Sequence, residues 1–264
     1  MYSFDYQRPG DRQAATAAAQ GDARFLAGGQ SLVQAMRLRL SQSERLVDLG
    51  GIADLKGIRV DGGSVVVGAM TTHAAVAASP EVRRAIPALA ELAGGIGDPM
   101  VRNMGTLGGS IANADPAADY PAALLALGAT VQTDRREIPA EQFFTGLYET
   151  ALAPGELITA VSFPIPQEAA YAKYRQPASR FALVGVFVAQ TAAGVRVGVT
   201  GAKSLVFRAQ PLEAALAASF TPAAAKAVAL PAAGINADLH ASAEYRAAMV
   251  SVMAARAVEA ALAR

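Results

Sequence analysis

Two short glycine-rich segments constrain the fold of this chain more than any other feature of its sequence. Residues 27–32 read AGGQSL, and residues 105–110 read GTLGGS. Glycine lets the backbone turn tightly and lets another group come close to its amides, and amides gathered at a turn or helix start attract anions. The pair predicts a pyrophosphate held between two segments distant in the chain, although either turn alone more often serves as a hairpin or a helix cap.

The two segments do not match the familiar nucleotide-binding motifs. Residues 27–32 do not follow the G-x-G-x-x-G pattern, although Asp48 lies where a dinucleotide fold would place its ribose acid. Residues 201–204, GAKS, end like a P-loop, but there the glycine must directly precede the lysine. Neither motif is therefore assigned.

Composition excludes several classes of protein. The chain contains no cysteine, so it cannot form disulfides, use a thiol nucleophile or ligate an iron–sulfur cluster through its own thiolates. Its two histidines, His73 and His240, are far apart in sequence, and we predict no metal site; His73 is expected to cap a helix or lie at the surface. Lys and Arg number 23 against 22 Asp and Glu, which does not indicate a nucleic-acid-binding protein.

Targeting signals are also absent from the sequence as given. The first residues, MYSFDYQRP, lack the basic start and apolar core of a signal peptide. Apolar runs such as residues 121–131 are far shorter than the roughly 20 residues needed to cross a bilayer. The expectation is a cytoplasmic protein with no membrane span.

Apolar periodicity and turn residues predict mixed strands and helices along the chain. Strands are predicted at residues 24–27, 46–49, 57–60, 64–68, 129–131, 157–163, 183–189 and 195–200. Helices are predicted at residues 31–40, 71–79, 81–93 and 121–127, near Glu213 and Ala223, and at 244–262. Ser31 and either Thr71 or Thr72 are predicted caps. Residues 164–167, PIPQ, read as a linker, so the strands and helices beyond it indicate a separate α+β unit.

Three stretches together resemble one known family. Residues 96–110, IGDPMVRNMGTLGGS, continue into NADPAAD at 113–119 and resemble the medium, FAD-binding subunits of molybdenum hydroxylases, the xanthine dehydrogenase and carbon monoxide dehydrogenase family. Residues 27–32 resemble the other FAD motif of that family, and ASAEYR at 241–246 is similar to a C-terminal stretch of the same subunits. The order and spacing of the three stretches make the resemblance specific, and it extends from Phe4 to the end of the chain.

The resemblance implies an α+β fold with two domains. A PCMH-type FAD-binding domain, of the vanillyl-alcohol oxidase kind, would cover residues 1–166 in two α/β lobes, about 1–55 and 56–166. A small C-terminal α+β domain of the carbon monoxide dehydrogenase flavoprotein type would cover residues 167–264.

The resemblance also implies a function in electron transfer. The chain would be the FAD-carrying oxidoreductase subunit of a heterotrimer, assembled as a dimer of heterotrimers. A large subunit would bind molybdopterin, and a small subunit would carry two [2Fe–2S] clusters. Electrons would pass from those clusters through FAD to an external acceptor. The molybdenum subunit would select the organic substrate, so the sequence of this chain predicts neither that substrate nor the electron acceptor.

Two alternatives come from other functional classes. A scaffold or regulatory module of the same fold would have lost the flavin, but both glycine-rich turns are intact here. A stand-alone flavin oxidase would need its own general base near the flavin N5. The sequence offers no clear base, so we name no catalytic residue.

The resemblance further implies which residues contact FAD. Residues of the first segment would cradle the pyrophosphate through their amides: Phe25, Leu26, Ala27, Gly28, Gly29, Gln30, Ser31 and Leu32. The second segment would do the same with Thr106, Leu107, Gly108, Gly109 and Ser110. The remaining contacts would be Ile96, Asn113, Asp119, Ile158, Tyr171 and Lys173.

Several of these residues have a second interpretation. Asp119 would contact polar groups of the cofactor or cap the helix that starts near Pro121. Ile96 would touch the flavin or fill the core, and Asn113 would bond to the cofactor or form a turn. Near the isoalloxazine, Tyr174 could replace Tyr171 as a shield, and Arg175 could replace Lys173.

Overall fold

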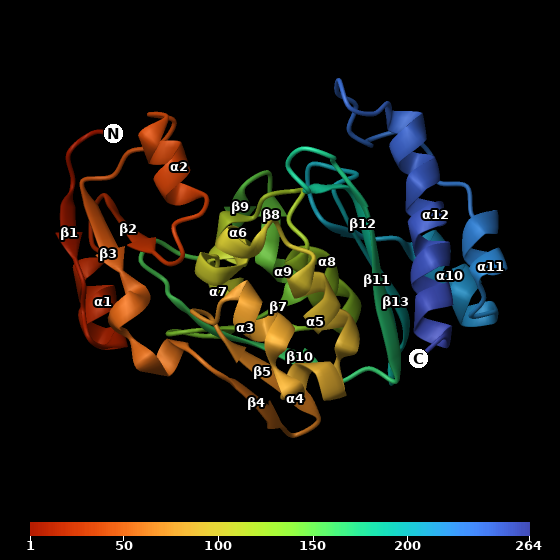
Figure 1. Ribbon diagram of the computed structural model, residues 1–264, viewed down its shortest axis with the longest axis horizontal. Helices are drawn as coiled ribbons and strands as arrows, with labels where there is room; N and C mark the ends of the chain where they lie inside the picture. Colours follow the sequence, from red (N-terminus) through yellow and green to blue (C-terminus); the bar gives the residue numbers. More distant parts are fainter.

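The computed structural model describes residues 1–264, and its strands form three main sheets (Figure 1). The first lobe is a three-stranded parallel sheet in the order β1-β3-β2. Its strands are β1 (Asp5–Gln7), β2 (Ala23–Leu26) and β3 (Arg45–Asp48). Helices α1 (Arg12–Ala18) and α2 (Leu32–Arg37) connect them, and two short 3-10 turns, η1 (Leu49–Gly51) and η2 (Ala53–Leu55), follow β3. A small core around Val47 and Ile52 holds this lobe together.

The second lobe is built on a five-stranded antiparallel sheet in the order β4-β5-β10-β6-β7. Its strands are β4 (Ile58–Asp61), β5 (Ser64–Gly68), β6 (Thr130–Thr133), β7 (Glu137–Pro139) and β10 (Ile158–Pro164). Its helices are α3 (His73–Ala78), α4 (Pro80–Ala85), α5 (Pro87–Gly94), α6 (Pro99–Met104), α7 (Leu107–Asn113), α8 (Tyr120–Leu127) and α9 (Ala140–Phe143). A two-stranded hairpin, β8 (Phe144–Gly146) with β9 (Glu149–Thr150), completes it.

The C-terminal part adds a four-stranded antiparallel sheet in the order β11-β12-β13-β14. Its strands are β11 (Glu168–Arg175), β12 (Ala182–Thr191), β13 (Gly194–Thr200) and β14 (Phe207–Arg208). Helices α10 (Gln210–Ala218), α11 (Pro222–Ala227) and α12 (Ala243–Leu262) cover the face of this sheet that points away from the second lobe (Figure 1). Ser242 caps α12 by accepting the amide of Tyr245.

Helix α8 joins the two larger sheets. Every residue of α8 is buried, because the helix packs against β12 and β13 on one side and belongs to the main core of the second lobe on the other. The core residues Phe187 and Ala189 reach from β12 into that same cluster. The C-terminal sheet is therefore tied to the second lobe by apolar packing, the dominant favourable contribution to folding.

The expected α+β class is confirmed, and most predicted elements are present, but two helices differ from the sequence prediction. The helix predicted at 81–93 is two helices, because Pro87 has no amide hydrogen to continue α4 and Ile86 adopts an extended φ of −140° before it. The helix predicted at 31–40 ends at Arg37, and Arg39 takes a left-handed φ of 59°.

Two further differences concern β11 and the second glycine-rich segment. Strand β11 was not predicted, because alanine occupies three positions of its sequence EAAYAKYR and the strand forms by pairing with β12. The segment 105–110 is not a free turn: Gly108 and Gly109 lie in the first turn of α7. No helix of the chain combines the length and apolar character needed to cross a membrane.

Candidate functional site

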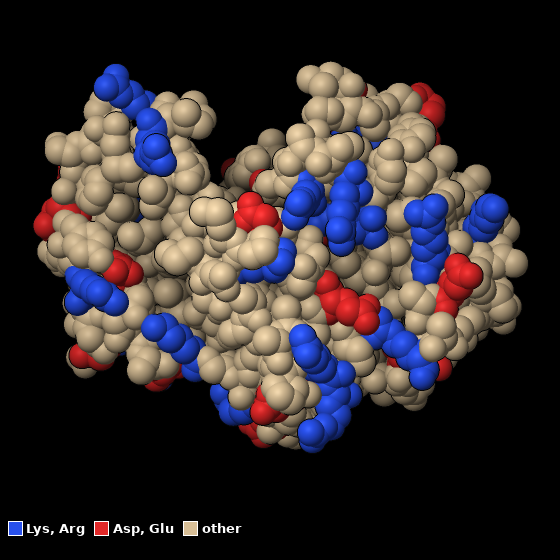
Figure 2. Space-filling view, viewed as in Figure 1, with Lys and Arg blue, Asp and Glu red and all other residues tan.

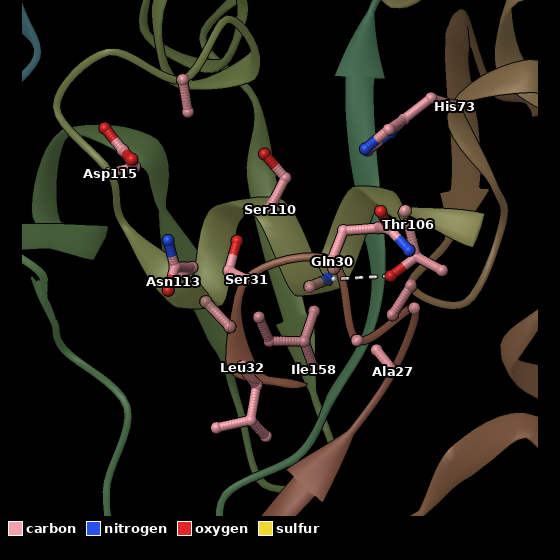
Figure 3. A pocket seen from close by; sticks show the side chains of 18 of the residues that line it. Ala27, Gln30, Ser31, Leu32, His73, Thr106, Ser110, Asn113, Asp115 and Ile158 are labelled. Atoms are coloured by element: carbon pink, nitrogen blue, oxygen red, sulfur yellow. Dashed lines mark hydrogen bonds between the residues drawn. The ribbon is translucent and has the colours of Figure 1, made fainter. Parts of the chain in front are cut away.

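Both glycine-rich segments line one cavity of about 410 Å³ (Figure 3). The first segment comes from the turn between β2 and α2, and the second from the start of α7. Residues 179–181, in the loop between β11 and β12, add part of a third wall. The volume lies in the range of small-molecule and cofactor sites, roughly 300–1,000 Å³. The cavity is therefore the main candidate site of the chain.

The two segments touch each other because glycine leaves room at their junction. A Cβ atom added at Gly28 would overlap the carbonyl oxygen of Met104 and lie 2.8 Å from the Cα of Gly105. A Cβ added at Gly109 would lie 3.3 Å from that of Ala27. These glycines thus admit a neighbouring part of the protein, whereas Gly29 is required for a left-handed φ of 70°.

Backbone amides distinguish the two segments. In the second, Leu107 donates to the Thr71 carbonyl at 3.0 Å and Gly108 to the Ala69 carbonyl at 2.8 Å. Gly109 donates to Oγ1 of Thr106 at 3.1 Å, and Ser110 to the Thr106 carbonyl at 3.0 Å. These four amides are engaged within the protein and are not free donors, so the pyrophosphate contacts of this segment stay a prediction.

The first segment has free donors instead. The amides of Gly28, Gly29, Gln30 and Ser31 make no hydrogen bond within the chain, and all four residues line the cavity. Ser31 precedes α2 but its side chain caps no amide, contrary to the prediction. Unbonded amides need a partner from solvent or a ligand, and successive amides of this kind form an anion-binding concavity.

Polar side chains in the same cavity also have free hydrogen-bonding capacity. Gln30, Ser31, Ser110 and Asn113 line it, and none of their side chains bonds to another residue of the chain. Figure 3 shows Ser31, Ser110 and Asn113 grouped on one side of the site. Among apolar residues, Ile96 and Ile158 also line the cavity.

Asp119 lies in the cavity wall, and its carboxylate is bonded to side chains of the C-terminal sheet. Its side chain is 5% exposed and accepts the hydroxyl of Tyr171 and the ammonium of Lys173, the latter at 2.9 Å. Lys173 is 4% exposed and also donates to the carbonyl of Gly95. Burial raises the pKa of Asp119, and Lys173 and Tyr171 oppose that rise. The interpretation as a helix cap was wrong, since the carboxylate accepts no amide of α8.

Most predicted contacts line the cavity, and the exceptions have clear packing reasons. Those outside the wall are Leu26, Leu107, Tyr171 and Lys173. Leu107 is fully buried in the main core, and Tyr171 stacks against Phe187 while bonding to Asp119. Tyr174, the alternative shield, packs edge-on against Tyr245 of α12. Neither tyrosine therefore reaches the cavity surface.

His73 was expected to be a cap or a surface residue, and it is neither. Thr72 caps α3 by accepting the amide of Ala75 at 3.2 Å, while His73 is only 5% exposed and lines the cavity. Burial, assisted by the charge of Arg102, lowers the pKa of His73 to about 4. The ring is therefore neutral near pH 7. Sequence reasoning missed it because a histidine after two threonines gives no local sign of burial.

Other residues of the wall were not among the predicted contacts. They are Arg24, Leu49, Met70, Gly97, Val101, Asp115, Leu152, Glu156, Leu157, Arg180 and Phe181. Arg180 reaches the carbonyl of Gly97 at 3.2 Å, which fixes the 179–181 loop against the start of α6. Over the face drawn in Figure 2, basic side chains fall into several clusters separated by acidic ones.

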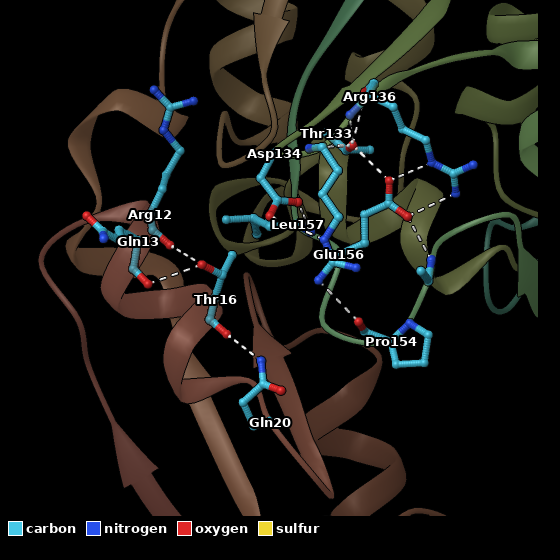
Figure 4. Close-up of polar contacts among 12 residues, drawn as sticks. Arg12, Gln13, Thr16, Gln20, Thr133, Asp134, Arg136, Pro154, Glu156 and Leu157 are labelled. Carbon is cyan, nitrogen blue, oxygen red and sulfur yellow. Dashed lines mark hydrogen bonds and ion pairs between the residues drawn. The ribbon is translucent and has the colours of Figure 1, made fainter.

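Glu156 anchors the loop that leads Leu157 and Ile158 into the cavity (Figure 4). Its side chain is fully buried and accepts the guanidinium of Arg136 at 2.9 Å, Oγ1 of Thr133 at 2.8 Å and the amide of Ala153 at 2.8 Å. Hydrogen bonding from Arg136 is the main cause that lowers the pKa of Glu156 to about 2.

We expect Glu156→Gln to lower the free energy of unfolding at pH 7 by about 1–3 kcal/mol, the usual cost of breaking a buried charged hydrogen bond. A depressed pKa stabilises the fold above the ordinary value of 4.5, and this stabilisation is lost as pH falls toward about 2. Urea unfolding between pH 7 and pH 2.5 should therefore show the two proteins converging in acid. Glu168→Gln, at an exposed position, is the matched control and should follow the parent throughout. A constant gap across that range would contradict the assignment.

Comparison with known proteins agrees with the geometry of the site. A sequence profile described as the FAD binding domain in molybdopterin dehydrogenase matches residues 2–166. The carbon monoxide dehydrogenase medium chain of Afipia carboxidovorans is 40% identical over 99% of this chain and 98% of its own length. The nicotine 6-hydroxylase medium subunit of Paenarthrobacter nicotinovorans is 36% identical over 90% of this chain and 89% of its own.

Solved structures match over the same extent. A structure of carbon monoxide dehydrogenase from Hydrogenophaga pseudoflava, which lacks the Mo-pyranopterin moiety, aligns with a TM-score of 0.89 at 36% identity. The alignment covers 99% of this chain and 98% of that one. The relatives are named as subunits of dehydrogenases and hydroxylases, which are oxidoreductases. This chain therefore belongs to the FAD-binding medium subunits of the molybdopterin dehydrogenases, with FAD as its cofactor.

Proposed function

We propose that this chain is the electron-transfer subunit of a cytoplasmic heterotrimeric molybdenum hydroxylase, assembled as a dimer of heterotrimers. A small partner would hold two [2Fe–2S] clusters and a large partner the molybdopterin. This chain would pass their electrons through FAD to an external acceptor. The absence of cysteine supports that division, because cluster ligation needs thiolates that these 264 residues do not contain.

The observation that carries the proposal is the set of free donors in the cavity. FAD contains an anionic pyrophosphate, and the four unbonded amides of residues 28–31 are suited to receive it. The free side chains of Gln30, Ser31, Ser110 and Asn113 can bond to its other polar groups. The residues present therefore fit FAD. When bound, FAD supplies one- and two-electron redox chemistry that no amino-acid side chain here provides.

The remaining residues would orient the cofactor and exclude water. Ile96 and Ile158 give the wall apolar surface for the flavin, and the Glu156 anchor holds the 152–158 loop in place. Asp119 would be fixed by Tyr171 and Lys173 before any cofactor binds, so its position costs little to organise. Leu26, Leu107, Tyr171 and Lys173 would act by supporting this wall and not by contacting FAD.

We also propose that the domain boundary lies at residues 166–167. The family profile ends at residue 166, and the four-stranded sheet begins at Glu168. A separate core of β12, β13 and the three C-terminal helices supports a second domain. Its sheet supplies Tyr171 and Lys173, which bond to Asp119 in the cavity wall of the first.

The test is anaerobic reduction of the purified chain. We expect it to bind about one FAD per chain, to pass electrons to an artificial acceptor once chemically reduced, and to remain oxidised when given carbon monoxide, purines, aldehydes or N-heterocycles alone. Adding both partner subunits and their substrate should bleach the flavin. Rapid bleaching by a substrate without partners would favour a stand-alone oxidase. A protein that takes up no FAD would favour a flavin-free scaffold.

A further inference from the structure

The least explained group in the cavity is the imidazole of His73. It is 95% shielded from solvent, yet its Nδ1 has no hydrogen-bond partner and no bond is formed by Nε2. Leaving a buried polar group without a partner costs about 1–3 kcal/mol. Buried unpaired groups in native proteins therefore call for a partner such as a ligand or ordered water.

The backbone fixes this imidazole at the junction of the two glycine-rich segments. The amide of His73 donates to the carbonyl of Gly105 at 3.0 Å. A Cβ added at Gly105 would lie 2.6 Å from Nε2 of His73, so the ring rests directly over the bare backbone there. The other side of this junction is Gly28, whose Cα faces the backbone of 104–105. The ring thus lies beside the turn that carries the free amides.

The direction of the side chain agrees with a role toward a ligand. Figure 3 shows the ring of His73 entering the site from α3, with a nitrogen directed toward the space above Thr106 and Gln30. No carboxylate bonds to the ring, so nothing in the chain supplies the acceptor that its N–H requires. A neutral imidazole offers one donor and one acceptor.

We propose that the imidazole of His73 donates a hydrogen bond to the pyrophosphate of FAD. This inference rests on the proposed function and adds a fifth donor to the four amides of residues 28–31. It makes His73 a cofactor-binding residue, with no part in the transfer of electrons.

Binding measurements on His73→Phe and His73→Gln would test the inference. The phenylalanine ring keeps the packing and removes the donor, while glutamine keeps an N–H. A hydrogen bond to a charged group is worth about 1.5–3 kcal/mol, so His73→Phe should raise the Kd for FAD about 10- to 100-fold, and His73→Gln should recover part of the loss. The Kd for ADP, which keeps the pyrophosphate and lacks the flavin, should rise in parallel. The midpoint potential of the bound flavin should not move.

The chain offers a matched control in its other histidine. His240 lies exposed in a loop before α12, so His240→Phe should bind FAD and ADP like the parent. The His240→Phe variant also allows a spectroscopic test, because its imidazole NMR signals come from His73 alone and should shift when ADP is added.

An unchanged Kd for FAD in His73→Phe would overturn the inference. So would a shifted potential together with unchanged ADP binding, since that result places the ring at the flavin. Failure of the parent chain to bind FAD would instead overturn the proposed function.

Discussion

Gly28→Ala should abolish FAD retention during purification. The added Cβ would overlap the carbonyl oxygen of Met104 and lie 2.7 Å from its carbonyl carbon. Both neighbours are backbone atoms, so no side-chain rotation relieves the overlap, and the two glycine-rich segments must move apart. Overpacking of this kind costs about 1–3 kcal/mol in stability. The larger effect is on binding, because the free amides of residues 28–31 leave their positions.

Flavin absorbance per chain and the Kd for added FAD would measure this effect. The control is Gly10→Ala, where an added Cβ meets nothing within 4 Å and φ is not left-handed. That variant should retain FAD and melt at the parent temperature. Full flavin occupancy in Gly28→Ala would show that contact between the segments is not needed to hold the cofactor.

Asp119→Ala should be the most destabilising single change in the cavity wall. It leaves the ammonium of Lys173 buried without its carboxylate and removes the acceptor of the Tyr171 hydroxyl. Removing one partner of a buried ion pair costs about 3–5 kcal/mol, because the other charge stays desolvated. Since Lys173 and Tyr171 belong to β11, we also expect the C-terminal sheet to separate more easily from the second lobe.

Urea unfolding of a double-mutant cycle would test this expectation. Lys173→Met should be destabilising too, whereas Asp119→Ala combined with Lys173→Met should be less destabilised than the sum of the two single variants, because no unpaired charge remains. Asp61→Ala is the control, since Asp61 and its partner Arg59 are 69% and 63% exposed and such pairs contribute about 0–1 kcal/mol. Additive losses across the cycle would show that the pair is not coupled.

Local sequence predicted many of the helices and strands, and the resemblance implied the cofactor. Strands β3, β5, β12 and β13 and helices α8 and α12 lie where apolar spacing placed them, because burial on one face imposes a period that a sequence displays directly. Pairing in β11 could not be read in the same way. Its alanine-rich sequence has little strand preference of its own, and β12 supplies the missing hydrogen bonds.

Part of the cavity wall was also predicted, since most residues of the two glycine-rich segments and Ile96, Asn113 and Ile158 line it. What each residue does there was not. The amides of 107–110 bond to Ala69, Thr71 and Thr106, whereas those of 28–31 are left without a partner in the chain. A motif shows where glycine is needed but not which neighbour occupies the space.

By itself, the sequence determined the α+β fold, the relation to FAD-binding medium subunits and the two segments that form the site. Only the tertiary structure decided that His73 is buried and unpartnered, that Asp119 bonds to Tyr171 and Lys173, and that Gly28 faces Met104. The physical reason is how far apart in the sequence the interacting residues lie. Backbone conformation and apolar periodicity depend on residues a few positions apart, whereas the partner of a buried polar group comes from a distant segment and is set by packing.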